Sequence, residues 1–217
     1  MRRLALLLAV VVGISAAGAL AARNPHAEKL RLTPEGKRLA KRAVLRSSDL
    51  GPDWTPISLP SDDSSLTCPG FDPDLSAFTI NGKATATYVH SALAQISSTA
   101  EVYASRAQAA GDFKAGARPQ LAACLRHVMD AAFRRTTGGL EASVVSSRMV
   151  QAPRLGERSA AYRVISKVRV NSLALRAYSD LLVVQRGRTI AALVFTGIDD
   201  PVPSQTTYGR IVAARMR

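Results

Sequence analysis

The sequence predicts an α+β domain in which an antiparallel sheet of about six strands is flanked by helices and held by a single disulfide. Two observations favour this class. Strand patterns follow one another directly in the second half of the chain, which is typical of antiparallel pairing, and two cysteines lie far apart in sequence. With 217 residues, 47% of them hydrophobic and 21% charged, the chain suits one domain with a packed core. We expect this domain to cover 47–217.

The first 21 residues have the pattern of a secretory signal peptide. Arg2 and Arg3 precede the apolar run Leu4–Gly13, and small residues then lead to an A-x-A cleavage site that ends at Ala21. The uncharged stretch from 4 to 22 could instead cross a bilayer as an uncleaved anchor, because about 1.5 Å of rise per residue would just span a core of roughly 30 Å. We therefore expect a secreted or extracytoplasmic protein, with an N-terminal membrane anchor as the alternative.

Residues 22–46 predict a polar lead-in followed by a basic amphipathic helix. Thr33 is a favourable cap and Pro34 suits the first helical position, whereas Gly36 is expected to weaken the helix. One face is apolar, and the opposite face carries four bases, Lys37, Arg38, Lys41 and Arg42. These bases could contact anionic lipid or a wall polymer. The alternative is that the helix packs on the domain while its charged face stays hydrated.

The segment 47–82 contains no base and six aspartates, and its Pro, Asp and Ser content predicts an irregular loop. It could neutralise the basic helix. Binding of Ca²⁺ is disfavoured because the spacing of a known calcium loop is missing. Trp54 could stack on a ligand or close the edge of the core. The aspartates are Asp49, Asp53, Asp62, Asp63, Asp72 and Asp74.

The remaining elements follow from hydrophobic periodicity. A hairpin is predicted at 185–188, where Gly187 interrupts two strand-like runs, and the helix that contains Leu121 and Cys124 has an apolar stripe. The predicted strands are 83–90, 94–103, 142–150, 159–168, 173–185 and 189–196, and the predicted helices are 105–115, 118–135 and 204–216.

Cys68 and Cys124 predict a disulfide, because export places an even pair of cysteines in an oxidising compartment. Cys124 lies on the inward stripe of its helix, where it can meet the loop that contains Cys68. Zinc binding is a poorer interpretation, since no CxxC occurs and the three histidines are isolated. We expect no bound metal.

No catalytic motif was found: the mature chain lacks the nucleophile-elbow, zinc-protease, Walker and dinucleotide patterns. His90 and His127 are better interpreted as surface residues than as catalytic ones. We therefore expect a protein that is not an enzyme and uses no cofactor. Export also disfavours nucleic acid as a partner. A secreted hydrolase is the alternative, and it would need one of these histidines to meet an Asp and a Ser in one cleft.

Several segments occur in a suggestive order: Asp49-Leu50-Gly51 with Trp54, Cys68, VYASRAQAA at 102–110, Cys124 and DLLVVQRGRTIAALVF at 180–195. This order resembles the exported sensor-type domains of actinobacteria, including the extracellular domain of a mycobacterial receptor Ser/Thr kinase and related envelope lipoproteins. The resemblance implies a sheet flanked by helices and a cleft for a ligand, and it carries over no catalytic residue. We expect a ligand-binding or sensor-like domain of the bacterial cell envelope, with a small apolar or anionic ligand.

Overall fold

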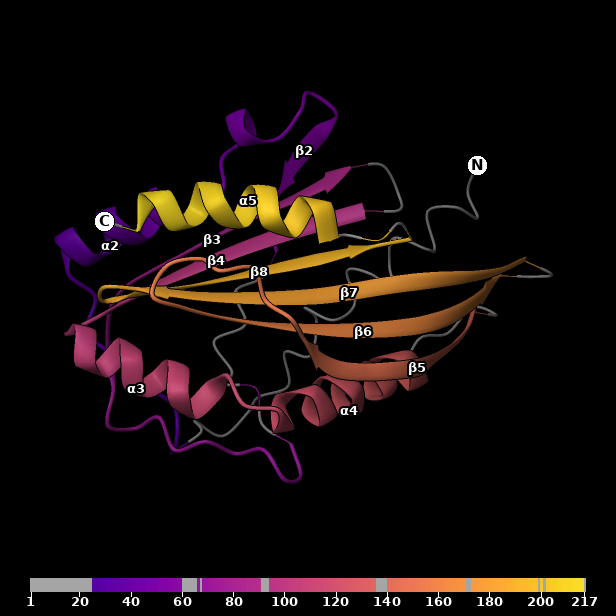
Figure 1. The fold of residues 1–217 in the computed structure, drawn as a ribbon, viewed down its shortest axis with the longest axis horizontal. Coiled ribbons are helices and arrows are strands. Elements are labelled where there is room, and N and C mark those ends of the chain that lie inside the picture. The colour runs from indigo at the N-terminus through magenta and orange to yellow at the C-terminus, as the bar shows by residue number, and fades with distance from the viewer. Residues whose placement is uncertain are drawn as a thin grey trace.

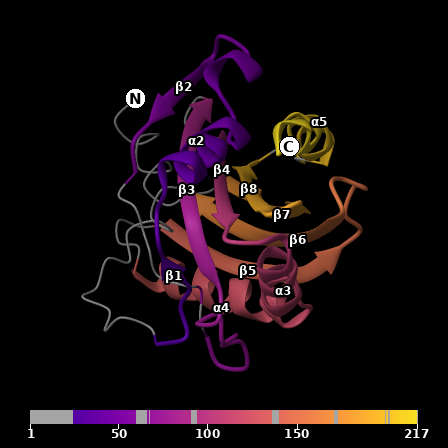
Figure 2. The ribbon, with the colours of Figure 1, turned by 90° about the vertical axis from the view of Figure 1, so that its left-hand side faces the viewer.

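A computed structural model describes residues 25–59, 66, 68–90, 94–135, 140–170, 173–198, 200 and 202–216. The predicted signal segment and two of the six aspartates, Asp62 and Asp63, lie outside these residues. The molecule has three layers, with a twisted sheet between two layers of helices (Figure 1 and Figure 2). The α+β class is confirmed.

The sheet contains eight strands in the described part of the chain, in the order β1-β3-β4-β8-β7-β6-β5, with β2 paired to β3 outside this path. All pairs are antiparallel except β1 with β3, which is parallel. The expected count of about six and the purely antiparallel pairing are corrected, because two short segments add to the edge of β3. The strands are β1 (Lys29–Leu30), β2 (Trp54–Ile57), β3 (Thr79–His90), β4 (Ala94–Tyr103), β5 (Leu140–Val150), β6 (Arg158–Val170), β7 (Leu173–Arg186) and β8 (Thr189–Gly197).

Helices cover both faces of the sheet (Figure 2). α2 (Pro34–Ala43) and α5 (Val202–Arg215) lie on one face, and α3 (Arg106–Gly116) and α4 (Gln120–Arg135) lie on the other. The largest core cluster forms beneath α2 and α5, while smaller clusters form beneath α3 and α4. Among the described residues, no helix combines the length and apolar character needed to span a bilayer.

α2 begins as the sequence predicts and sits directly on β3. The Thr33 hydroxyl accepts a hydrogen bond from the Gly36 amide at 3.0 Å, and Pro34 occupies the first turn. A Cβ atom on Gly36 would lie only 2.2 Å from the carbonyl oxygen of Asn81, and one on Gly82 would lie 2.0 Å from the Gly36 backbone. The glycine that costs helix propensity is therefore what permits the helix and strand to touch.

The disulfide between Cys68 and Cys124 is confirmed, with their Cα atoms 5.6 Å apart. It ties the loop before β3 to α4. Cys124 is buried against Phe71, Leu121 and Tyr162. The predicted hairpin is also confirmed: β7 and β8 meet through Gly187, whose φ of 57° favours glycine.

Candidate functional site

A cavity of about 320 Å³ opens between α2, the last turn of α5 and the β7–β8 hairpin. Its polar lining is dominated by arginine. Arg42 comes from α2, Arg215 from α5, and Arg186 and Arg188 from the two sides of Gly187 in the hairpin. The turn at Gly187 thus brings two guanidinium groups to the place where the two helices end. We call this the arginine pocket.

Carboxylates hold two of these arginines in position. Asp49 binds Arg215 through two hydrogen bonds of 2.5 and 2.7 Å, and Glu35 binds Arg188. Partial burial acts to raise the pKa of Asp49, but its hydrogen bonds with Arg215 and the Arg46 amide lower the pKa below its ordinary value. The arginine side chains are thereby fixed before any ligand arrives, which reduces the entropy cost of binding.

Among the described residues that line the pocket, Glu157 is the one acid. Its carboxylate accepts hydrogen bonds from the Gly187 amide at 3.1 Å and from the Gln185 side chain at 3.3 Å, and it pairs with Arg106. The bond from the Gly187 amide is the largest cause that lowers the pKa of Glu157. This carboxylate is thus ionised and bound to the hairpin. Asp49 and Glu35 offset two of the four arginines, so the pocket keeps a small net positive charge.

The rest of the lining is small or apolar. Leu39 of α2 and Met216, just after α5, form its apolar part, and Thr189 contributes a hydroxyl. Pockets for small molecules generally begin at about 300 Å³, so this one suits a small ligand. Its chemistry favours an anionic group with a short apolar portion.

The four bases predicted on α2 divide between two environments. Lys37, Arg38, Lys41 and Arg42 are all exposed, but only Arg42 lines the pocket. In the described part of the chain, no ion pair joins the other three to a carboxylate. The acidic segment makes its ion pairs elsewhere: Asp49 with Arg215 in α5, and Asp72 with His26 at 3.0 Å.

The histidines considered for catalysis lie on separate elements. The ring of His90, at the end of β3, lies 5.2 Å from the ring of Trp54, which packs against the main core. His127 is exposed on α4. Within the described ranges, no hydrogen bond links either histidine to a carboxylate, and no group of His, Cys, Asp or Glu is arranged to hold a metal ion.

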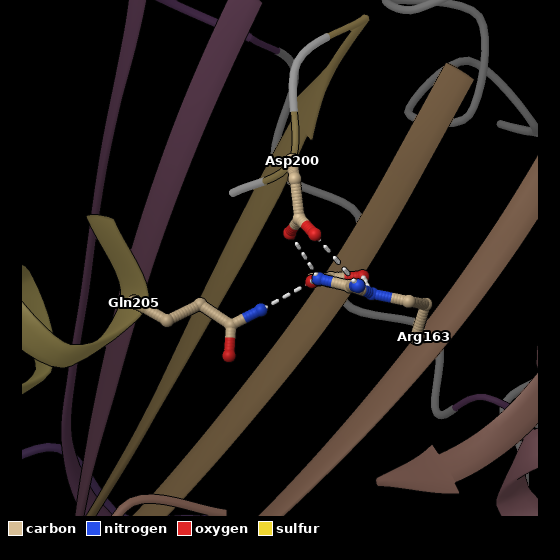
Figure 3. A network of polar contacts seen from close by, with 4 residues as sticks. Arg163, Asp200 and Gln205 are labelled. Carbon is tan, nitrogen blue, oxygen red and sulfur yellow. Dashed lines mark hydrogen bonds and ion pairs between the residues drawn. The ribbon is translucent and has the colours of Figure 1, made fainter. Parts of the chain in front are cut away.

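Sequence reasoning missed a polar network beneath the start of α5 (Figure 3). The Arg163 guanidinium in β6 donates to Asp180 in β7, with its shortest bond at 2.6 Å, and to Asp200 at 2.6 Å. The side-chain amide of Gln205 in α5 also donates to Asp180. Burial raises the pKa of Asp180, although Arg163 opposes the shift. Because its carboxylate is fully buried and has several donors, we interpret the network as the attachment of α5 to the sheet. An aspartate within an apolar strand was the signal for it.

Comparison with known proteins gives a loose structural likeness. No protein-family model matches the chain, and no curated protein is significantly similar to it. The structure is similar to the crystal structure of the extracellular domain of PknH from Mycobacterium tuberculosis, with a TM-score of 0.46 and 10% identity over 83% of this chain and 94% of that chain. The resemblance seen in the sequence agrees with this likeness. A likeness at this level does not transfer a function.

Proposed function

We propose that this protein is a non-enzymatic binding domain of the bacterial cell envelope, and that its ligand is a small anion held in the arginine pocket. The observation that carries the proposal is the convergence of four arginines on one cavity of about 320 Å³. A guanidinium offers a planar fork of donors that matches a carboxylate or phosphate group. Leu39 and Met216 would contact the apolar portion of the ligand.

An extracytoplasmic location is supported by two independent features. The N-terminal 21 residues have the signal pattern, and the Cys68–Cys124 disulfide is of a kind that persists in oxidising compartments. The absence of a second apolar run of spanning length after residue 22 favours release or a single N-terminal anchor.

A binding role is favoured over catalysis by the chemistry of the lining. A hydrolase needs a nucleophile activated by a base, or a general acid with a suitable pKa. Among the described residues of the lining, Thr189 alone has a hydroxyl side chain, and Glu157, with its lowered pKa and its three donors, is a weak proton acceptor. We therefore expect bound ligand to be released unchanged.

Thermal unfolding with a panel of ligands tests the proposal. The panel compares inorganic phosphate, small carboxylates and phosphorylated sugars with neutral analogues of the same size, alongside mass spectrometry of small molecules that co-purify with the exported protein. A ligand that binds only the folded state at one hundred times its dissociation constant stabilises it by about 2.7 kcal/mol. We expect the anionic ligands, and not their neutral analogues, to raise the melting temperature, and we expect the increase to be larger at low salt.

The matched variants are Arg42→Gln and Lys41→Gln, which make the same charge change on neighbouring residues of α2. Only Arg42→Gln removes a group that lines the pocket. It should abolish most of the shift, and Lys41→Gln should retain it. If the ligand shifts the melting temperature equally in both variants, the effect comes from general charge screening and the arginine pocket is not the binding site. Turnover of a bound ligand would contradict the non-enzymatic role.

A further inference from the structure

The ends of β5, β6 and β7 that lie farthest from the β7–β8 hairpin project beyond the rest of the sheet (Figure 1). β8 ends at Gly197, opposite Tyr178, so in the described part of the chain the residues of β7 before 178 pair with β6 alone. We call this part, 140–148, 163–170 and 173–178, the wing. The first half of β7 is exposed or half-buried, whereas most of its second half is buried.

The two faces of the wing differ in chemistry. On the face toward α4, Val144 and Val164 are buried against Met129. Alternation along the strands places Arg163, Lys167 and Arg169 on the opposite face, which is the side of α5. The register adds Arg148, opposite Arg163, and Arg176, opposite Lys167. All of these bases except Arg163 are exposed.

Like charges face one another directly across this surface, twice. Arg148 is the partner of Arg163, and Lys167 is the partner of Arg176. Directly opposed like charges destabilise a sheet. The carboxylates of the network pair with Arg163, and Glu141 lies 3.5 Å from Arg169. Among the described residues, no ion pair joins Arg148, Lys167 or Arg176 to a carboxylate.

Apolar side chains are exposed on the same projection. Leu173 pairs with Val170 next to the β6–β7 hairpin, so alternation places it on the face toward α4, opposite the bases. Leu173 is 59% exposed, and Val145, at the bulge of β5, is 57% exposed. A projecting edge that combines exposed apolar groups with unpaired bases has the composition of a surface that rests in a lipid interface. With the hairpin end entering the interface first, Leu173 would reach the acyl boundary while Lys167 and Arg176, on the other face of the hairpin, meet anionic headgroups.

We propose that the wing is a docking surface for a membrane of anionic lipid. The charge complementarity comes from Lys167 and Arg176 on one face of the β6–β7 hairpin, and the depth of contact comes from Leu173 near its end, on the other face. This surface is separate from the arginine pocket, so docking does not depend on the proposed ligand. It is also distinct from the basic face of α2, which has no large apolar residue among its four exposed bases.

Co-sedimentation with vesicles tests the proposal. The exported protein is mixed with vesicles of phosphatidylcholine alone or of phosphatidylcholine with phosphatidylglycerol. We expect binding only to the second kind, and weaker binding as salt is added. The double variant Lys167→Gln/Arg176→Gln should lower the affinity roughly tenfold or more, because each base near an anionic surface contributes to attachment.

Controls identify the surface and the partner class. Lys37→Gln/Lys41→Gln removes the same charge from α2 and should leave vesicle binding within about twofold of the parent protein, as should Arg42→Gln in the pocket. Leu173→Ser should weaken vesicle binding and leave the melting temperature unchanged. An equal loss in the α2 variant would overturn the assignment to the wing. Binding that is insensitive to Leu173→Ser and is equally strong to soluble polyphosphate would overturn the assignment to lipid.

Discussion

One face of the sheet carries two groups of cationic side chains in opposite surroundings. Arg163 lies under α5, where its side chain is 12% exposed and its carboxylate partner Asp180 is completely buried. Lys167 lies four residues further along β6 on the same face and is exposed opposite Arg176. The comparison shows that burial determines whether a charged side chain needs an ion pair. A buried charge needs a partner of opposite sign, whereas a hydrated charge can remain next to a charge of the same sign.

The comparison predicts that removal of the buried cation has the largest effect. Arg163→Ala leaves the buried Asp180 without its cationic partner and should lower the free energy of unfolding by about 3–5 kcal/mol at neutral pH. Denaturation in urea measures this loss. The loss should shrink as pH falls, because a neutral Asp180 no longer needs the guanidinium. The matched double variant Arg163→Met/Asp180→Leu should recover most of the stability, and a double variant as unstable as Arg163→Ala would contradict this account.

The disulfide lies on the other face of the sheet, where it ties the loop that contains Cys68 to α4. Cys124 is buried there. Cys124→Ala should lower stability by roughly 2–4 kcal/mol, since the unfolded chain gains freedom when the cross-link is lost. Thermal unfolding of both single variants and of the double variant measures it. Cys68→Ala should cost a similar amount and the double variant little more, whereas strictly additive losses would show that the two residues act separately.

Asp112 in α3 is a half-buried acid, and among the described residues no ion pair joins it to a base. It therefore extends the comparison. Burial raises the pKa of Asp112 to about 7, against a hydrogen bond with Tyr103 that lowers it, and the nearby carboxylates Glu28 and Glu101 raise it further. Lys83 lies 3.4 Å from Glu101 in this cluster. The folded state therefore binds a proton more tightly than the unfolded state does.

Stability from Asp112 is present below about pH 4 and is lost as pH rises toward 7, because the charged form is disfavoured only in the folded state. Asp112→Asn should remove this dependence and stabilise the protein by on the order of 2 kcal/mol above pH 7, a figure discounted for partial exposure. Urea denaturation across pH 4–8 measures the difference between the two proteins. Parallel pH profiles would show that Asp112 has an ordinary pKa.

The smallest expected effect belongs to the wing. Lys167→Thr removes one of the two positive charges that oppose each other at Lys167 and Arg176, and it should raise the free energy of unfolding by about 0.2–1 kcal/mol. The increase should vanish in high salt, because screening already weakens the repulsion between exposed charges. Lys37→Thr on α2 is the control and should change stability little. A loss of stability in Lys167→Thr would mean that the lysine has an attractive partner.

Much of the fold could be predicted from periodicity. The strand Ala94–Tyr103 has the predicted bounds, and the hairpin at Gly187 is found where expected. β1 and β2 were missed because their stability comes from pairing with β3 and not from their own pattern. β1 has two residues, and β2 contains Pro56, which is compatible only with an edge strand.

The sites were harder to predict than the elements. Of the arginine pocket, the sequence indicated Arg42 alone, because the other lining arginines come from segments that only the folded chain brings together. The opposition of Lys167 and Arg176 also depends on strand register, which one sequence does not reveal. Asp180 could have been noticed as a charge in an apolar strand, but its partner Gln205 lies on a different element.

The contact between Asp49 and Arg215 joins positions 166 residues apart, and the same guanidinium reaches the carbonyl of Val44 at 3.4 Å. α2 and α5 also share one core cluster. A nascent chain therefore cannot close this core until both segments have been made, and such long-range closure slows folding. Under the export proposed above, this delay is useful: a chain that stays open during synthesis can pass through a translocation channel and complete its fold on the far side.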